Sequence, residues 1–354
     1  MTFADVTPNL VRLWSSLRSR TAQTAFVALL TVCALMGALA AAPAGPRFNL
    51  GVLRRDGLLV PFAAFDGGNW SAPWPSGDVG VPLPITLADV PKKWWGPPGP
   101  GASWTAWLSD GTTRTLKLGK PVHVPVFCDG HLAITTDYRG GPVDPGEPTV
   151  SKDGLAIAGD VKLQDVARVS IYAPETRHLV DVLTEDFNKE EARAAKHFMR
   201  WTHPYDADER KAFPIELEAL YRASDATARG AWRTSYIEAV RRFPARPEDA
   251  GCGLITFARG WVTEIDGKKP IINIGARVTY CDRAEVSFML PFGRLVLDKD
   301  VYWVFQISSW RDELYSVART RPDGVRPVVA VAGGECPRGM APGAAWRGRG
   351  RGGE

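Results

Sequence analysis

The sequence lacks the short motifs that identify several common enzyme classes. It has no GxxxxGK[ST] phosphate loop, no GxGxxG after a strand pattern, no GxSxG nucleophile elbow, no HExxH and no CxxC. Enzymes without short motifs exist, so these absences lower the expectation of catalysis without removing it. The sequence therefore leaves enzymatic activity open and favours a non-catalytic protein.

Histidine is scarce, with five residues, and no two have the spacing of a zinc-binding helix. A turn at Asp129-Gly130 would place His123 opposite Thr136 and His131 opposite Cys128, so these histidines are not expected to share a ligand. Asp186-x-Asn188-x-Glu190 lacks the glycine and the last acidic ligand of a calcium loop, and helix capping explains it better. We expect no metal site and no cofactor.

Excess positive charge is missing from the body of the chain. The net charge is +4, but Arg12, Arg18 and Arg20 lie near the N-terminus and four further arginines lie after residue 337. The remaining body is close to neutral, which argues against a nucleic-acid partner. The arginine- and glycine-rich tail, 337–354, is expected to be disordered.

One long apolar run is present, from Ala25 to Ala42, after the N-terminal arginines. It ends in small residues, and Ala38-Leu39-Ala40 fits a signal-peptidase site. Residues 1–40 therefore predict a signal peptide, with an uncleaved membrane anchor as the alternative. Either interpretation places the protein outside the cytoplasm, periplasmic or secreted, and membrane contact is expected only through a retained N-terminal segment.

Export changes how the four cysteines beyond this run are interpreted, because an oxidising compartment favours disulfides. If Asp266-Gly267 forms a two-residue hairpin turn, Cys252 and Cys281 face each other within disulfide reach. Cys128 and Cys336 then pair by elimination. Four buried free thiols are the alternative.

Turn signals and alternating apolar residues predict a mainly β protein. Asp-Gly occurs seven times, often between short apolar runs, as at Asp129-Gly130, and Val122, Val124 and Val126 alternate before that turn. We predict antiparallel, sandwich-like sheets joined by hairpins, with a propeller-like arrangement as the alternative. One β region spans 41–180 and includes a loop rich in proline and tryptophan, and a second spans 246–336.

The middle of the chain, 181–245, has a mixed pattern with one clear helix near 189–200. Asn188 fits an N-cap with Glu191 at the reciprocal capping position. Alternation over 215–222 favours a strand. Residues 232–243 fit helix and strand equally well, because Trp232, Tyr236 and Val240 are also spaced as on one helix face.

Tryptophan is the unusual feature, with six of thirteen residues between positions 70 and 107. Trp70, Trp74, Trp94 and Trp95 lie in its irregular part and are the predicted ligand-binding residues, for a carbohydrate or a protein. The alternative is that these rings fold back as the loop's own core. Asn69-Trp70-Ser71 also forms a glycosylation acceptor triplet.

These observations favour an exported, non-catalytic binding or structural module of the cell envelope or extracytoplasmic space. The alternative is a secreted hydrolase whose carboxylates, such as Asp186 and Asp282, meet only in the fold. The sequence names no ligand.

Overall fold

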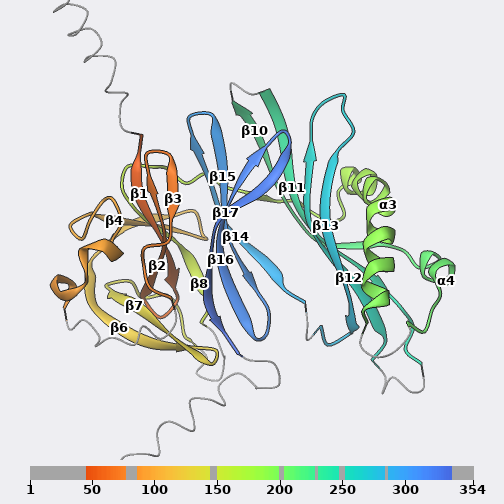
Figure 1. Cartoon of the computed structure of the whole chain (residues 1–354), viewed down its shortest axis with the longest axis horizontal. Coiled ribbons are helices and arrows are strands. Elements are labelled where there is room, and N and C mark those ends of the chain that lie inside the picture. The colour runs from red at the N-terminus through yellow and green to blue at the C-terminus, as the bar shows by residue number, and fades with distance from the viewer. Residues whose placement is uncertain are drawn as a thin grey trace, which may run out of the picture. The chain divides into compact units, whose positions relative to one another are not determined.

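The computed structural model describes residues 45–76, 86–143, 150–198, 203–227, 230–246, 252–283 and 286–336, without the side chain of Glu175. The predicted signal or anchor segment and the Arg/Gly tail lie outside these residues. The described chain is mostly β, with antiparallel sheets and one clear helix, as predicted, and one sheet curls into a half-barrel (Figure 1).

Sheet A has eight strands and comes from the first half of the chain. Its main path runs β5-β4-β8-β1-β2-β7-β6, and β3 pairs with β2. The strands are β1 (Arg47–Arg54), β2 (Leu58–Asp66), β3 (Asn69–Ser71), β4 (Trp104–Leu108), β5 (Thr113–Leu116), β6 (Leu118–Val126), β7 (Asp129–Thr136) and β8 (Lys152–Ala158). Two short 3-10 helices, η1 (Leu87–Asp89) and η2 (Lys92–Trp94), lie between β3 and β4.

Sheets B and C come from the part of the chain that follows sheet A. Sheet C has the order β13-β12-β11-β10-β9, and sheet B has the order β14-β15-β16-β17. Sheet C consists of β9 (Ala167–Arg168), β10 (Glu216–Thr227), β11 (Gly230–Arg242), β12 (Leu254–Glu264) and β13 (Ile271–Tyr280). Sheet B consists of β14 (Phe288–Leu297), β15 (Asp300–Ser308), β16 (Asp312–Arg321) and β17 (Gly324–Glu335).

Sheet B packs against another sheet on each of its two faces. Alternate residues along its strands point to opposite faces, so neighbouring residues belong to different cores. On β15, Tyr302 and Val304 belong to a core shared with Phe48 and Leu50 of sheet A. Trp303 and Phe305, one position along, belong to a core shared with sheet C. Sheet A therefore packs on one face of sheet B and sheet C packs on the other.

A buried ion pair also joins sheets A and B. Lys152 Nζ on β8 lies 2.8 Å from Glu313 Oε2 on β16, and both side chains are almost fully buried. Burial lowers the pKa of Lys152, and the Glu313 carboxylate opposes that shift. Glu313 also accepts hydrogen bonds from the Tyr315 hydroxyl and the Gln306 amide.

Helix α3 (Pro174–Lys196) covers the opposite face of sheet C from sheet B. It begins well before the predicted start, with Pro174 at its first turn, so Asn188 is not an N-cap. Asn188 instead accepts a hydrogen bond from Arg241 Nη2 at 2.9 Å, and Glu191 forms a buried ion pair with the same arginine. These polar residues fix the helix to β11. The local capping pattern at Asn188 and Glu191 therefore does not mark the start of the helix.

Two further segments of the middle region, 215–222 and 232–243, lie almost entirely within strands. The strand expected at 215–222 is confirmed by β10, and the ambiguous 232–243 segment is β11. Asp206 caps a short helix, α4 (Ala207–Lys211), by accepting from the amides of Asp208 and Glu209.

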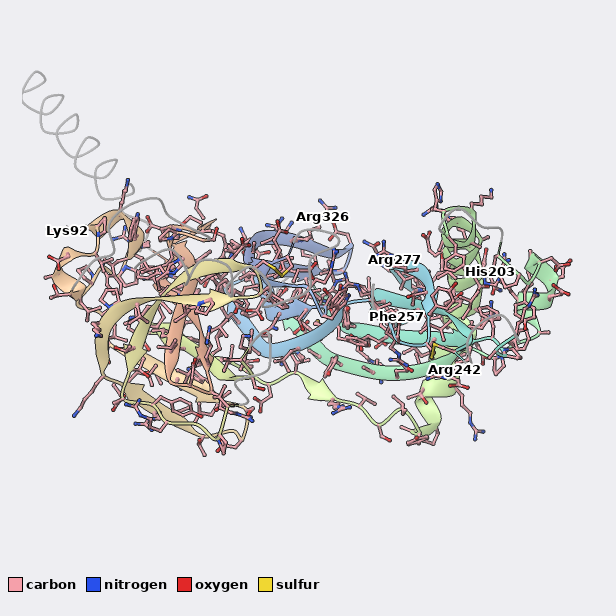
Figure 2. All side chains as sticks on the ribbon, turned by 90° about the horizontal axis from the view of Figure 1, so that it is seen from below. Lys92, His203, Arg242, Phe257, Arg277 and Arg326 are labelled. Carbon is pink, nitrogen blue, oxygen red and sulfur yellow. A yellow bond between two sulfur atoms is a disulfide. The ribbon has the colours of Figure 1, made fainter. Side chains whose placement is uncertain are left out.

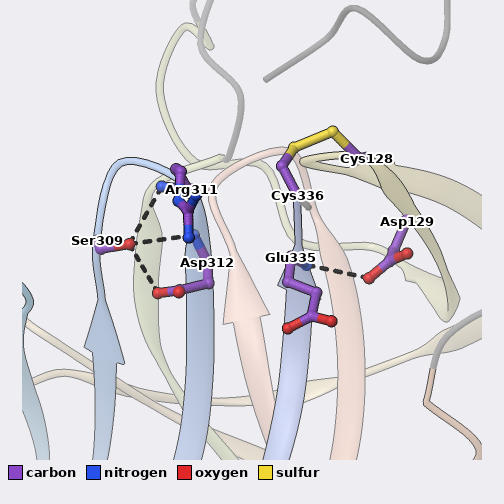
Figure 3. Close-up of a disulfide and its surroundings, with 7 residues drawn as sticks. All are labelled: Cys128, Asp129, Ser309, Arg311, Asp312, Glu335 and Cys336. Carbon is purple, nitrogen blue, oxygen red and sulfur yellow. Dashed lines mark hydrogen bonds between the residues drawn. A yellow bond between two sulfur atoms is a disulfide. The ribbon is translucent and has the colours of Figure 1, made fainter. Parts of the chain in front are cut away.

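Both predicted disulfides are present. Cys128 follows β6 and Cys336 follows β17, so this bond joins sheet A to sheet B (Figure 3). Cys252 and Cys281 join the entry of β12 to the exit of β13.

In both hairpins the observed pairing register differs from the one that the Asp-Gly turn predicts. Leu254 pairs with Tyr280, so Cys252 and Cys281 are one position out of direct opposition and bond just beyond the paired residues. In the other hairpin Val126 pairs with Asp129, which makes Phe127-Cys128 the turn instead of Asp129-Gly130. Phe127 accordingly has a left-handed backbone, with φ 55°. An Asp-Gly pair thus predicted that a hairpin forms, but not which two residues make its turn.

Candidate functional site

The tryptophan-rich segment is largely a core. Trp74 is 4% exposed and Trp95 is 1% exposed, and both pack with Trp104 on the face of sheet A that is turned away from sheet B. The Trp74 indole donates to the Leu132 carbonyl at 2.9 Å, and its ring lies 5.4 Å from that of Trp95. Both rings are therefore buried, as the alternative of a loop core expects, and ligand binding by these two residues stays a prediction.

The other two predicted rings, Trp70 and Trp94, are half-buried. Trp70 contacts Phe65 and Tyr302, with ring centroids 5.0 and 5.2 Å apart, at the edge of the core between sheets A and B. Trp94 packs edge-on against Trp74. Asn69 itself is exposed beside the Gly67-Gly68 turn, which leaves the acceptor triplet accessible.

The histidines and acidic residues singled out in the sequence do not converge. His123 pairs with Leu132 and His131 with Val124, and burial lowers the pKa of His131. Asp282 lines a hollow beside α3 whose lining does not include Asp186. No group of three or more His, Cys, Asp or Glu side chains in the described ranges is arranged to hold a metal ion.

An open surface instead lies on the helix-free face of sheet C, the face opposite α3. Strict alternation along β12 and β13 places Trp261 beside Asn273, Arg259 beside Gly275 and Phe257 beside Arg277. Figure 2 labels Phe257 and Arg277 on these neighbouring strands. Their other faces, with Ala258, Val262 and Ile274 among them, pack under α3.

We call the hollow over these residues the arginine groove. It has a volume of about 650 Å³, and its far wall includes Val325 and Pro327 of β17. Its lining includes Arg259, Trp261, Asn273, Gly275, Arg277 and Ser287. No Asp or Glu belongs to the described residues that line it. A polar hollow with this lining favours ligands that carry negative charge.

Gly275 lies in the floor of this groove. A Cβ atom added at Gly275 would meet no atom within 4 Å, so no neighbouring side chain requires a glycine there. Its absent side chain keeps space open between the two arginines, which are diagonal neighbours across β12 and β13.

A second hollow, the glutamate hollow, lies over β10 and β11 on the same face of sheet C. It measures about 610 Å³ and is lined by Glu218 and Glu238 together with Arg242 and Arg283. The pairing of β10 with β11 is interrupted at Glu218, between Leu217 and Ala219. Such a bulge redirects a side chain, and here it brings Glu218 to Arg242 and Arg283.

Three glutamates, Glu216, Glu218 and Glu238, line this hollow, and the pKa of Glu238 is shifted. Burial raises the pKa of Glu238 to about 7, although the Met289 amide donates to its carboxyl at 2.8 Å and opposes the shift. Arg283 Nη1 donates to Glu218 Oε2 at 2.7 Å, and Arg242 pairs with the same carboxylate. A carboxyl that keeps its proton beside an ion-paired carboxylate can hold or release a proton near neutral pH.

The sequence could not have located either hollow. Arg259, Gly275 and Arg277 lie in ordinary alternating strands, and their common face depends on the β12–β13 register, which the turn signal misplaced by one residue. Glu218 reaches its partners only through a bulge.

No helix in the described ranges has the length and apolarity needed to cross a membrane. No family model, no curated protein and no solved structure matches this chain.

Proposed function

We propose that this chain is an exported, non-catalytic binding module whose ligand is anionic and occupies the arginine groove. The observation that carries the proposal is the groove's lining, which places Arg259 and Arg277 on one strand pair and includes no Asp or Glu among its described residues. Glu238 of β11 lies opposite Arg259, outside that lining. Carboxylates and phosphates bind arginine through paired, charge-assisted hydrogen bonds.

The place of action follows from the cysteines. Two disulfides indicate an oxidising, extracytoplasmic environment. Export through the N-terminal segment, whether cleaved or retained as an anchor, agrees with this environment and belongs to the proposal. The ligand is then a component of that compartment, such as an acidic envelope polymer or an acidic protein segment.

The proposal is tested by filling the groove. Gly275→Trp places an indole over the groove floor, where the open space accommodates it. We expect the wild-type protein to bind poly-L-glutamate or polyphosphate at low salt, more weakly as salt rises, and not to bind neutral dextran. Gly275→Trp should weaken that binding at least tenfold without changing the thermal midpoint by more than a few degrees.

A matched control is Gly101→Trp, at another glycine whose added Cβ meets nothing within 4 Å and which does not line the groove. This variant should bind as the wild type does. Equal binding by Gly275→Trp, or no binding of either polyanion to the wild type, would contradict the proposal.

A further inference from the structure

β13 differs from every other strand that ends a sheet. On their main paths the three sheets end in β5, β6, β9, β13, β14 and β17. An exposed edge presents unpaired backbone groups to other chains, and proteins usually protect it by shortness, proline, charge or bulges.

Five of these edges are protected in such ways. β5 has four residues and β9 has two. β6 contains Pro121 and Pro125, β14 contains Pro291 next to a register shift, and β17 contains Pro327 next to another. The three-residue strand β3, which branches from β2, is also short.

Of these protections β13 has only charge, and that at a single residue, Arg277. It runs for ten residues, IINIGARVTY, with no proline, one charged residue and no register shift in its pairing with β12. No described strand pairs with its outer edge.

The register shows which backbone groups face outward. The Cys281 amide donates to the Gly253 carbonyl, and these residues continue the register of the β12–β13 pair. In an antiparallel pair, hydrogen-bonded positions alternate along the strand. Odd-numbered residues of β13 therefore bond to β12, and the N–H and C=O groups of Ile272, Ile274, Ala276 and Val278 point away from it.

Hollows flank this edge on both faces of the sheet. The arginine groove lies on the helix-free face, and a hollow of about 490 Å³ lies on the other, between β13 and the last turns of α3. Ala276 and Arg277 line both hollows. The second hollow, which we call the α3 hollow, includes the apolar side chains of Ala194, Phe198 and Val278.

From this arrangement we propose that β13 binds an extended, acidic peptide segment of a partner protein by strand addition. The inference rests on the proposed function and names its ligand. The peptide's backbone pairs with the outward groups of β13, while alternate side chains enter the two hollows. Acidic side chains lie toward Arg259 and Arg277, and apolar side chains lie toward Phe198 and Val278.

Charge favours such a peptide over a second copy of this chain. Antiparallel pairing of two β13 strands would bring two arginine grooves together on one face, with four arginines and no carboxylate among their described lining residues. Like charges placed close together on one face of a sheet are destabilising, whereas glutamate or aspartate in the added strand is attracted.

The test uses a seven-residue peptide in which glutamate alternates with valine, measured against the full exported protein. In an antiparallel addition the valines lie opposite the even-numbered residues of β13, so the valine amides point at β13. N-methylation of the valines should weaken binding at least tenfold, whereas N-methylation of the glutamates should leave it nearly unchanged. Binding should also slow the hydrogen exchange of the Ile272, Ile274 and Ala276 amides, measured by NMR.

Four outcomes would overturn strand addition, and the first three leave the proposed function standing. If both methylated peptides bind like the parent, the groove holds acidic ligands without backbone pairing, and the proposed function stands. If the parent peptide fails while polyphosphate binds, strand addition is also wrong and the groove remains an anion site. If sedimentation shows a dimer that Ala276→Pro dissociates, a second copy occupies the edge. Failure of the peptide and of both polyanions would reject both proposals.

Discussion

The tryptophan-rich segment of sheet A and the β12–β13 pair of sheet C contrast in how they use their side chains. Trp74, Trp95 and Trp104 are conspicuous in the sequence and are nearly fully buried. Arg259, Gly275 and Arg277 are inconspicuous in the sequence and line an open groove. Large aromatic rings outside regular strands can serve to cover a sheet, and an open groove can arise from ordinary alternation where a neighbouring sheet leaves part of a face uncovered.

The largest expected effect is the loss of unfolding free energy when each disulfide is removed, one joining sheet A to sheet B and the other joining β12 to β13. Cys128–Cys336 has a sequence separation of 208 residues, and Cys252–Cys281 has one of 29. The chain-entropy model predicts stabilisation of about 5 and about 3.5 kcal/mol, respectively, because the longer loop restricts the unfolded chain more. Paired Cys→Ser variants, compared by denaturant unfolding, measure both values. A larger loss for the sheet C pair would show that local native contacts outweigh loop length.

The next largest effect on unfolding free energy is expected from removing a buried tryptophan ring of sheet A. Trp95→Ala should cost about 3–5 kcal/mol of unfolding free energy, since it empties a buried site between Trp74 and sheet A. Trp310→Ala, at a ring that is 47% exposed, serves as the matched control and should change stability by about 0.5 kcal/mol or less. Similar small losses for both variants would mean that the Trp95 ring is not part of the core in solution.

A smaller effect concerns pH and the glutamate hollow. Below pH 4.5 both the folded and unfolded forms of Glu238 hold a proton, and between 4.5 and about 7 only the folded form does. The unfolding free energy therefore falls by about 2–3 kcal/mol as pH rises through that window, then levels off. The groups facing this carboxyl are the Met289 amide, Arg259, Glu218 and Arg283.

Glu238→Gln isolates that contribution, because glutamine keeps an acceptor for the Met289 amide without a titrating proton. The variant should lose this part of the pH slope and exceed the wild type in stability above pH 7. Denaturant midpoints measured from pH 4 to pH 9 provide the comparison. Parallel pH profiles would place the pKa of Glu238 near its ordinary value. His131 contributes the opposite slope, because its lowered pKa makes stability fall as pH drops below 6.5.

Local chemistry in the sequence predicted much of the fold. Asp-Gly turns, alternation such as Val122, Val124 and Val126, and the even number of cysteines beyond the N-terminal apolar run sufficed to predict antiparallel hairpins and both disulfides. They failed where tertiary contacts decided. Asn188 fits an N-cap locally, but its contact with Arg241 on β11 places it inside a longer helix. The site was less predictable still, since it depends on register, on a bulge and on which sheet face stays uncovered.

The disulfide between Cys128 and Cys336 has a mechanical consequence for a chain that is held at one end and pulled at the other. Tension applied to residues 46 and 336 would pass from Cys128 directly into Cys336, so sheets B and C and helix α3 would carry no load. Only sheet A strands before Cys128 lie on the direct force path. Reduction of that one bond would place the 208-residue separation in series. Because Cys252–Cys281 still closes off 29 of those residues, roughly 600 Å of extensible chain would be released, at about 3.3–3.6 Å per residue. The bond thus shields the β13 edge from mechanical unfolding.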